Sequence, residues 1–582
     1  MRVRTPPRAA IPLLACIALV YGFLQWHLPH QAFWSNDGGE KLLQVKALAE
    51  SHFTSAALPY DSLRLEPAGS FEFAPFLPAH AQVVNGRLLS VVPVYFPLLS
   101  SLPYALWGHG GLYLLPLLST LLTLSCLLLL ATALGDGPAA PLTVVAAGLA
   151  SPLFFYSLTF WEHTLAAALC AGGILLLHRG HHRSVAGRIN GQSLLAALLM
   201  TLAAWLRGEV FVLLLASGAA MLWCREYRRL LPSFLLGMIA ALLPYALINY
   251  QLYASAASPQ LSGVDTALRD LSPGLLLHRW REVSTYLLTG YLDRPLINRL
   301  LFLLGIAPAL LVYFHRQPSP RRDALILTWC ALLCFSSLVT LGRLFFLDSP
   351  MNSSMTILGL FGSLPFLPLA LVRTDSAAST AQHGSLRFLS LIALLTLAGL
   401  CLALPSRGGL QWGPRYALPL VPLLILLAVS GFTRLRQSLT SPAARRACTA
   451  LFLLLLLTGT GIQAFGVSLL FGKKQVTMTN MEQIRRMAPR VIITDTWWVP
   501  EDNGELYGQY PFYAFYTYDK MGRLLTLLAR RGEREVLLVS SADYREFIAR
   551  QPGLAVTSFQ QTIHPGMSMF NLSLHTIRLG QP

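Results

Sequence analysis

Two acidic side chains stand close to the first apolar segment of the chain. The apolar segment covers 9–28, and the run SNDGGEK at 35–41 follows it and holds Asp37 and Glu40. Because only 27 of the 582 residues are acidic, this placement is informative. A carboxylate beside a membrane can act as a general base toward a hydroxyl group, or can ligate a divalent cation. The run is therefore the first candidate site of chemistry.

The glycines of this run leave two interpretations of its backbone. Asn36, Gly38 and Gly39 favour a tight, exposed turn where the chain leaves the membrane. The alternative is a helix over 41–51 that is capped by the run, with Asp37 at its first turn. In the first interpretation the acid is presented for chemistry, and in the second it stabilises a helix.

An acid and an imidazole also separate two later apolar segments. Glu162 and His163 lie between the apolar stretches 140–158 and 163–178, with no other charge nearby. Ionisable groups at membrane depth are costly and usually serve a function. The alternative is a structural pair of Glu162 with His163 or with an arginine.

Several arginines occupy similar positions at the ends of apolar segments. Arg207 and Glu209 stand between two such segments, and Arg407, Arg415 and Tyr416 precede a late one. An arginine at the mouth of an apolar groove suits a phosphate or diphosphate, because its planar group binds two oxygens at once. The alternative is that these side chains extend to lipid headgroups.

The composition indicates what must position these residues. The chain is 54% hydrophobic and 12% charged, with a mean hydropathy of +0.54. Soluble domains carry roughly 25% charged residues. Apolar runs near the length that crosses a bilayer recur along the chain, so we expect a polytopic α-helical membrane protein. The expected spans, about 13 in number, are 9–28, 111–134, 140–158, 163–178, 192–206, 209–224, 231–249, 297–314, 324–342, 354–372, 387–404, 416–433 and 447–471.

The basic residues set the expected topology. The net charge of +17 comes from arginines and lysines that cluster in short loops between apolar runs, which is typical of membrane topology and not of nucleic-acid binding. The loops become consistently basic on one side only if the proline-interrupted segment 88–107 lies at the outer face without crossing. We therefore expect a cytoplasmic N-terminus, an external C-terminus, and external loops at 29–110 and 250–296.

The composition changes at Lys473, and the remaining residues predict a second domain. A membrane domain over 1–472 would be followed by a small external α/β domain over 473–582, because short strand and helix patterns alternate there. An aromatic tract over 497–518 predicts a surface on the headgroup layer or a platform that stacks sugars. The 8 cysteines lie in or beside apolar runs and show no metal-binding spacing.

These features together resemble the GT-C superfamily of membrane glycosyltransferases, which includes protein O-mannosyltransferases and lipid A aminoarabinose transferases. The run 35–40 is similar to the first-loop acidic motif of that superfamily. The stretch from Ser151 to His163 is similar to its second-loop motif, and the segment WGPRY at 412–416 to the entry of a late helix. The second-loop acid here is Glu162, where Asp is more usual.

The resemblance implies an inverting transfer of a sugar from a polyprenyl-phosphate donor on the periplasmic face of a bacterial inner membrane. Asp37 would be the general base and Glu162 would assist it or orient the acceptor. Glu40, His163 and Glu209 would support the site. The donor phosphate would meet a basic and aromatic set, namely Arg207, Arg407, Arg415 and Tyr416.

The expected partners are the lipid-linked donor, membrane lipids, and a glycan, lipid or protein acceptor, without nucleic acid. No cofactor is expected with certainty; if a divalent cation binds, Asp37 and Glu40 are its expected ligands. Two alternatives remain. One is a flippase or transporter of lipid-linked saccharides, and the other is an oligosaccharide ligase or polymerase of a different membrane fold.

Overall fold

The structure is a computed structural model of the 582-residue chain. It describes residues 10–60, 65–66, 70–76, 80–135, 137–183, 188–261, 272–288, 303, 306, 319–347, 358–372, 380–404 and 410–580.

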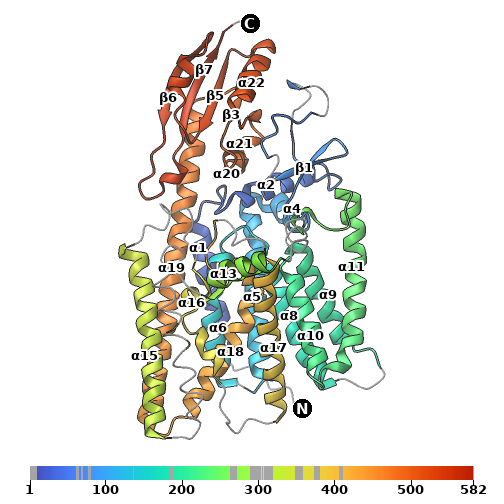
Figure 1. Ribbon diagram of the computed structural model, residues 1–582, viewed down its shortest axis with the longest axis vertical. Coiled ribbons are helices and arrows are strands. Elements are labelled where there is room, and N and C mark those ends of the chain that lie inside the picture. The colour runs from blue at the N-terminus through green and yellow to red at the C-terminus, as the bar shows by residue number, and fades with distance from the viewer. Residues whose placement is uncertain are drawn as a thin grey trace.

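A bundle of apolar helices forms the larger part of the molecule, and a mixed sheet lies at one end of it (Figure 1). The helices up to the long α19 are α1 (Ala10–His27), α2 (Asn36–Glu50), α4 (Tyr95–Trp107), α5 (Leu114–Ala133), α6 (Ala140–Gly148), α7 (Pro152–Ser157), α8 (His163–Arg183), α9 (Gly191–Leu206), α10 (Val210–Trp223), α11 (Leu231–Tyr253), α13 (Pro273–Leu288), α15 (Pro320–Gly342), α16 (Leu360–Ser363), α17 (Thr380–Ala403), α18 (Val421–Gln437) and α19 (Pro442–Arg486).

The prediction of a polytopic membrane protein is supported by the lengths and composition of these helices. Within the described ranges, six helical segments are long and apolar enough to cross a bilayer, and α9 and α10 are shorter apolar helices. The six segments are Ala10–His27, Tyr95–Ala133, Arg228–Tyr253, Pro320–Phe346, Gln382–Ala403 and Pro442–Arg486. The expected span 297–314 falls outside the described residues except for 303 and 306, so the count of about 13 spans stays a prediction.

Two of the expected spans are not single helices. The stretch 140–158 is divided into α6 and α7, because Ser151 caps a new helix by accepting a hydrogen bond from the Leu153 amide and Pro152 occupies its first position. The described part of 354–372 forms the short α16 and a 3₁₀ segment, Leu367–Leu371. Hydropathy alone did not distinguish these broken segments from continuous helices.

The segment 88–107 contains the end of strand β2 (Arg87–Ser90) and the helix α4, and its expected place at the outer face without crossing stays a prediction. A hairpin of β1 (Ala81–Val84) and β2 leads into α4, which packs against α2. The chain turns back at Gly108, whose φ is +59°, and a Cβ at Gly111 would overlap the backbone of Pro103. The exposed side of α4 is apolar and carries Leu99, Leu102 and Trp107.

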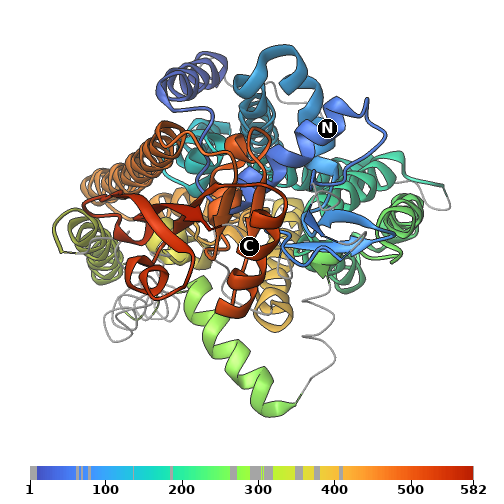
Figure 2. The same cartoon turned by 90° about the horizontal axis from the view of Figure 1, so that it is seen from above.

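The C-terminal sheet has the order β4-β3-β5-β7-β6. Strand β3 runs parallel to β4 and β5, and β7 runs antiparallel to β5 and β6. Its elements are β3 (Ile492–Thr494), α20 (Val499–Asp502), α21 (Gly504–Tyr507), β4 (Phe512–Ala514), α22 (Tyr518–Arg530), β5 (Glu535–Ser540), α23 (Arg545–Ala549), β6 (Leu554–Gln561) and β7 (Ser573–Leu579). The expected mixture of strands and helices is present. Seen from above, this sheet lies over the bundle, and α13 extends to the edge of the bundle (Figure 2).

The aromatic tract at 497–518 is divided between the protein core and the surface, where Trp497, Tyr516 and Tyr518 are exposed. Tyr507, Phe512, Tyr513 and Phe515 are buried, and the tract includes α20, α21 and β4, which the sequence pattern did not predict. Most of these rings fill the space between the small sheet and the external loop, where they provide apolar area that the short strands lack.

Helix α19 joins the two parts of the molecule without a break. It has 45 residues and continues through Lys473 and Lys474, where the composition changes. Both lysines are buried, and their ammonium groups contact Asp502 and the carbonyl oxygen of Pro29, respectively. The basic loop before α19 therefore lies at the opposite end of this helix from the sheet (Figure 1).

Candidate functional site

Asp37 lies in the first turn of α2. This helix begins at Asn36, so the prediction of an exposed turn is wrong and the helix interpretation is right, with a start earlier than expected. The two glycines serve close packing: a Cβ at Gly38 would meet the Phe33 side chain at 2.6 Å, and a Cβ at Gly39 would overlap the carbonyl oxygen of Glu501. An acid in the first turn is also favoured by the helix dipole.

The Asp37 carboxylate faces a group of cations. Its side chain is 32% exposed, and its Oδ2 atom lies 3.9 Å from an Nη of Arg415. Burial favours the neutral carboxyl, but the charges of Lys41, Arg415, His80 and Arg207 outweigh it and lower the pKa of Asp37 below its usual value. Asp37 is therefore ionised at neutral pH and reachable from outside.

Glu162 lies in the turn before α8 and is held by two cations. Lys41 Nζ lies 2.7 Å from its Oε2 atom, and an Nη of Arg207 lies 2.9 Å from its Oε1 atom. All three side chains are buried. Burial alone would raise the pKa of Glu162, but these two charges lower it. The structural pairing with an arginine, one of the two interpretations from the sequence, is thus present.

The predicted basic and aromatic residues surround this pair. Arg207 Nε also donates to Glu209 at 2.8 Å, and the Arg207 guanidinium lies 5.8 Å from the centre of the Tyr416 ring. Arg415 lies 5.1 Å from the Tyr416 ring and 5.5 Å from that of Trp161. Stacking of this kind holds guanidinium groups in place.

His163 is enclosed by aromatic rings. It stacks on Tyr156 at 5.1 Å and lies 4.8 Å from Trp161, and its two ring nitrogens have no hydrogen-bond partner among the described residues. It forms no ion pair with Glu162, so of the two pairings expected for that acid only the one with an arginine is seen.

The structure thus brings Asp37, Glu162, Arg207, Arg415 and Tyr416 into one connected cluster, with Glu209 and His163 beside it. Arg407 lies outside the described residues. Sequence reasoning gave no role to Lys41 or Trp161, although a signal existed for Lys41, since it lies one helical turn after Asp37 and so on the same side of α2.

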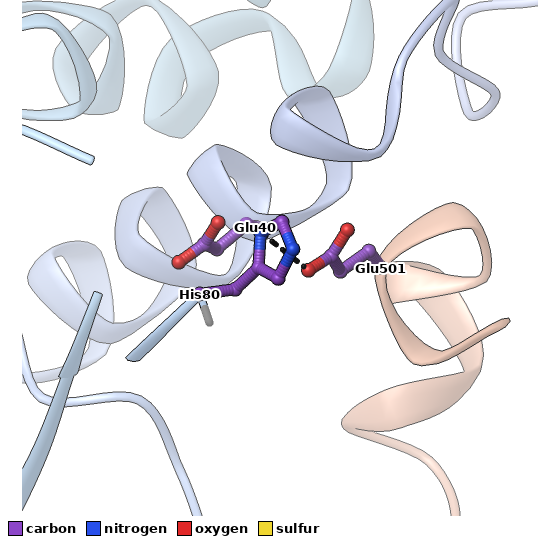
Figure 3. Close-up of side chains that lie close together, drawn as sticks. All are labelled: Glu40, His80 and Glu501. Atoms are coloured by element: carbon purple, nitrogen blue, oxygen red, sulfur yellow. Dashed lines mark ion pairs between the residues drawn. The ribbon is translucent and has the colours of Figure 1, made fainter. Parts of the chain in front are cut away.

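Glu40 faces a different group of side chains. Its carboxylate accepts a hydrogen bond from Ser90 and lies near His80 and Glu501 (Figure 3). Burial raises the pKa of Glu40 to about 8, although the hydrogen bond from Ser90 opposes this shift. The structure therefore groups Glu40 with His80 and Glu501, where the sequence had suggested Asp37 as the second ligand of a cation.

The fold is similar to those of two solved membrane enzymes. ArnT from Cupriavidus metallidurans, in a structure bound to undecaprenyl phosphate, matches with a TM-score of 0.51 and 13% identity over 97% of this chain and 97% of that chain. The Archaeoglobus fulgidus oligosaccharyltransferase, in complex with Zn and sulfate, matches with a TM-score of 0.50 and 12% identity over 92% of this chain and 69% of that chain. Both proteins belong to the GT-C superfamily. The sequence matches no protein-family model and no curated protein.

Proposed function

Because the chain has the GT-C fold, we propose that it is a glycosyltransferase that moves a sugar from a polyprenyl-phosphate donor to an acceptor on the periplasmic face of a bacterial inner membrane. One observation carries this proposal. An ionised, partly exposed Asp37 lies 3.9 Å from Arg415 within a cluster of cations, and this cluster lies at the same end of the bundle as the C-terminal sheet.

In this proposal Asp37 is the general base. Its carboxylate accepts the proton of an acceptor hydroxyl while the hydroxyl oxygen forms a bond to the anomeric carbon of the sugar. The bond from that carbon to the phosphate oxygen breaks on the opposite face, so the configuration inverts and the polyprenyl phosphate leaves with the bonding electron pair. The exposed part of the Asp37 side chain provides access for the acceptor.

Arg415 is the best-placed residue to receive the donor phosphate. Its side chain is 13% exposed, whereas that of Arg207 is 3% exposed and is held at short distances by both Glu162 and Glu209. An incoming phosphate would offer Arg415 closer oxygens than Asp37 does. ArnT, which has a similar fold, was solved with undecaprenyl phosphate bound, and this agrees with a lipid-linked donor. Arg407 remains a proposed second phosphate ligand.

The ion pairs that Glu162 forms with Lys41 and Arg207 then have a positioning role. Lys41 is on the same helix as Asp37, and Arg207 approaches the Tyr416 ring that also contacts Arg415. Glu162 joins Lys41 to Arg207 and so fixes the distance between the proposed base and the proposed phosphate site. Glu209 fixes the other side of Arg207.

The test is transfer by the full-length protein in liposomes. Labelled polyprenyl-phosphate sugars and potential acceptors extracted from bacterial membranes are supplied, and release of the polyprenyl phosphate is followed. Asp37→Asn should reduce the rate by about 10²- to 10⁴-fold, the usual contribution of a general base. Asp519→Asn changes an exposed acid on α22 and is the matched control. A wild-type rate in Asp37→Asn removes the proposed role, and movement of the lipid across the bilayer without release of phosphate indicates a transporter.

A further inference from the structure

Three side chains from separate parts of the chain converge beside α2. Glu40 lies on α2, His80 directly precedes β1, and Glu501 lies on α20 of the C-terminal segment (Figure 3). One nitrogen of the imidazole and one oxygen of each carboxylate all lie within 4.8 Å of one another. Asp37 is not part of this group.

The two carboxylates are buried without adequate partners. Glu40 and Glu501 have no exposed surface, and one oxygen of Glu40 and both oxygens of Glu501 have no hydrogen-bond partner among the described residues. His80 Nδ1 lies 3.2 Å from one Glu501 oxygen. Buried charges without partners cost several kcal/mol each, so an arrangement that places two of them together needs a compensating positive charge.

A shared proton does not satisfy this group. One proton between Glu40 and Glu501 satisfies one oxygen on each residue, and His80 Nδ1 lies 3.2 Å from the other Glu501 oxygen, but the two carboxylates together still keep one buried negative charge. A cation at the centre would instead contact both carboxylates and the imidazole at once.

We propose that Glu40, His80 and Glu501 bind a divalent transition-metal ion of the zinc type. One imidazole nitrogen with two carboxylate oxygens is a ligand set that zinc accepts, and the imidazole disfavours magnesium and calcium. Two ligand atoms of one tetrahedral zinc ion, each at about 2.1 Å from it, lie about 3.4 Å from each other. The ligand atoms here lie within 4.8 Å of one another, so the most distant pair needs to approach by up to about 1.4 Å, which side-chain rotations allow.

The surroundings hold the ligands in place. Ser90 donates to Glu40, and the His80 ring stacks on Trp497 with a centroid distance of 4.9 Å and an angle of 9°. The backbone of His80 is fixed by a bond from its amide to the Phe76 carbonyl. Partners of this kind orient metal ligands and raise the affinity of the site.

The bound ion would connect the C-terminal segment to the helix that carries Asp37. Glu501 comes from α20, and α20 already contacts α2 at Gly39. The role of the ion is to position α2, and this role does not depend on which reaction the protein catalyses.

The experiment uses the full-length protein in detergent, purified with a tag that contains no histidine. The protein is stripped with EDTA, mixed with Zn²⁺ and passed through a desalting column, and its metal content and thermal midpoint are measured. We expect one zinc ion per chain and a higher midpoint with zinc. Glu501→Gln and His80→Ala should each weaken zinc binding by at least about 100-fold. Loss of a hydrogen-bond partner of a metal ligand already costs up to about 100-fold, and loss of a ligand itself should cost no less. Glu482→Gln and His52→Ala change exposed residues and are the matched controls.

Retention of one zinc ion per chain in Glu501→Gln, or no zinc in the wild type, overturns the proposal. So does displacement of the zinc by millimolar Mg²⁺. X-ray absorption of the zinc-loaded wild type does not depend on the folding of any variant. One nitrogen with oxygen ligands supports the site, whereas sulfur or several imidazoles overturn it.

Discussion

Lys41 Nζ lies 2.7 Å from Glu162 Oε2, and this contact joins the helix that carries Asp37 to the turn before α8. Both side chains are almost completely buried, with exposed fractions of 1% and 3%. A buried pair is costly to break because one charge is then left without its partner. The position of Asp37 relative to the membrane helices therefore depends on this pair.

Lys41→Met should destabilise the protein by about 3–5 kcal/mol, the usual effect of removing one member of a buried ion pair. The thermal midpoint of the purified protein in detergent measures it. Arg486→Gln, which breaks an exposed pair with Glu482, should cost less than about 1 kcal/mol and serves as the control. If Lys41→Met and Glu162→Gln have effects that simply add in the double variant, the two side chains do not interact as the structure indicates.

Gly39→Ala should disrupt the contact between α2 and α20, because the new methyl group would overlap the carbonyl oxygen of Glu501. We expect a lower thermal midpoint and faster proteolysis of the C-terminal segment. Gly522→Ala is the matched control: Gly522 lies on α22 with nothing within 4 Å of the added Cβ. This control should be neutral or gain about 0.5–1 kcal/mol, since alanine is the better helix former. Equal midpoints for the two variants would contradict the close packing.

The pH dependence of transfer should report the environment of Asp37. The neighbouring cations lower its pKa, so the base stays ionised as the pH falls from neutral through its usual value, and the rate is lost only below that value. Arg415→Gln removes one of these charges. The pKa of Asp37 then rises, and the acid limb of kcat/KM moves to higher pH. An unmoved acid limb would show that the limb belongs to another group.

Arg415→Gln should also weaken the binding of undecaprenyl phosphate. Hydrogen bonds to charged groups contribute about 1.5–3 kcal/mol, so we expect a loss of roughly 10- to 100-fold in affinity. Binding to the full-length protein can be followed by the quenching of tryptophan fluorescence, with Arg531→Gln as a control at an exposed arginine. Unchanged affinity would place the phosphate elsewhere, with Arg207 or Arg407 as the next candidates.

The sequence predicted the cluster better than it predicted the local structure. Asp37, Glu162, Arg207 and Arg415 were recognisable because each is an ionisable residue at the end of an apolar segment, and the charge pattern put them on the same side of the membrane. The conformation at Asp37 stayed open between a turn and a helix, because glycines that permit a turn also permit close packing between helices. A glycine is needed at position 39 because α20 packs against it, and no local sequence pattern contains that information.

The group around Glu40 could not be predicted for the same reason. Its other members, His80 and Glu501, come from an external loop and from the C-terminal segment, and neither stands in a recognisable metal-binding spacing. The aromatic tract was similarly ambiguous, because buried and surface aromatic residues have the same composition. Contacts between distant segments depend on packing, and only the three-dimensional structure contains them.

The continuity of α19 fixes the rotation of the C-terminal sheet as well as its height. An α-helix turns by about 100° and rises by 1.5 Å per residue. A single residue inserted into the 45-residue helix before Lys473 would swing the sheet around the helix axis and carry Glu501 away from Gly39. An insertion of seven residues, close to two full turns, would restore the direction but raise the sheet by about 10 Å. The contact between the sheet domain and the bundle therefore forms at one length of α19 only.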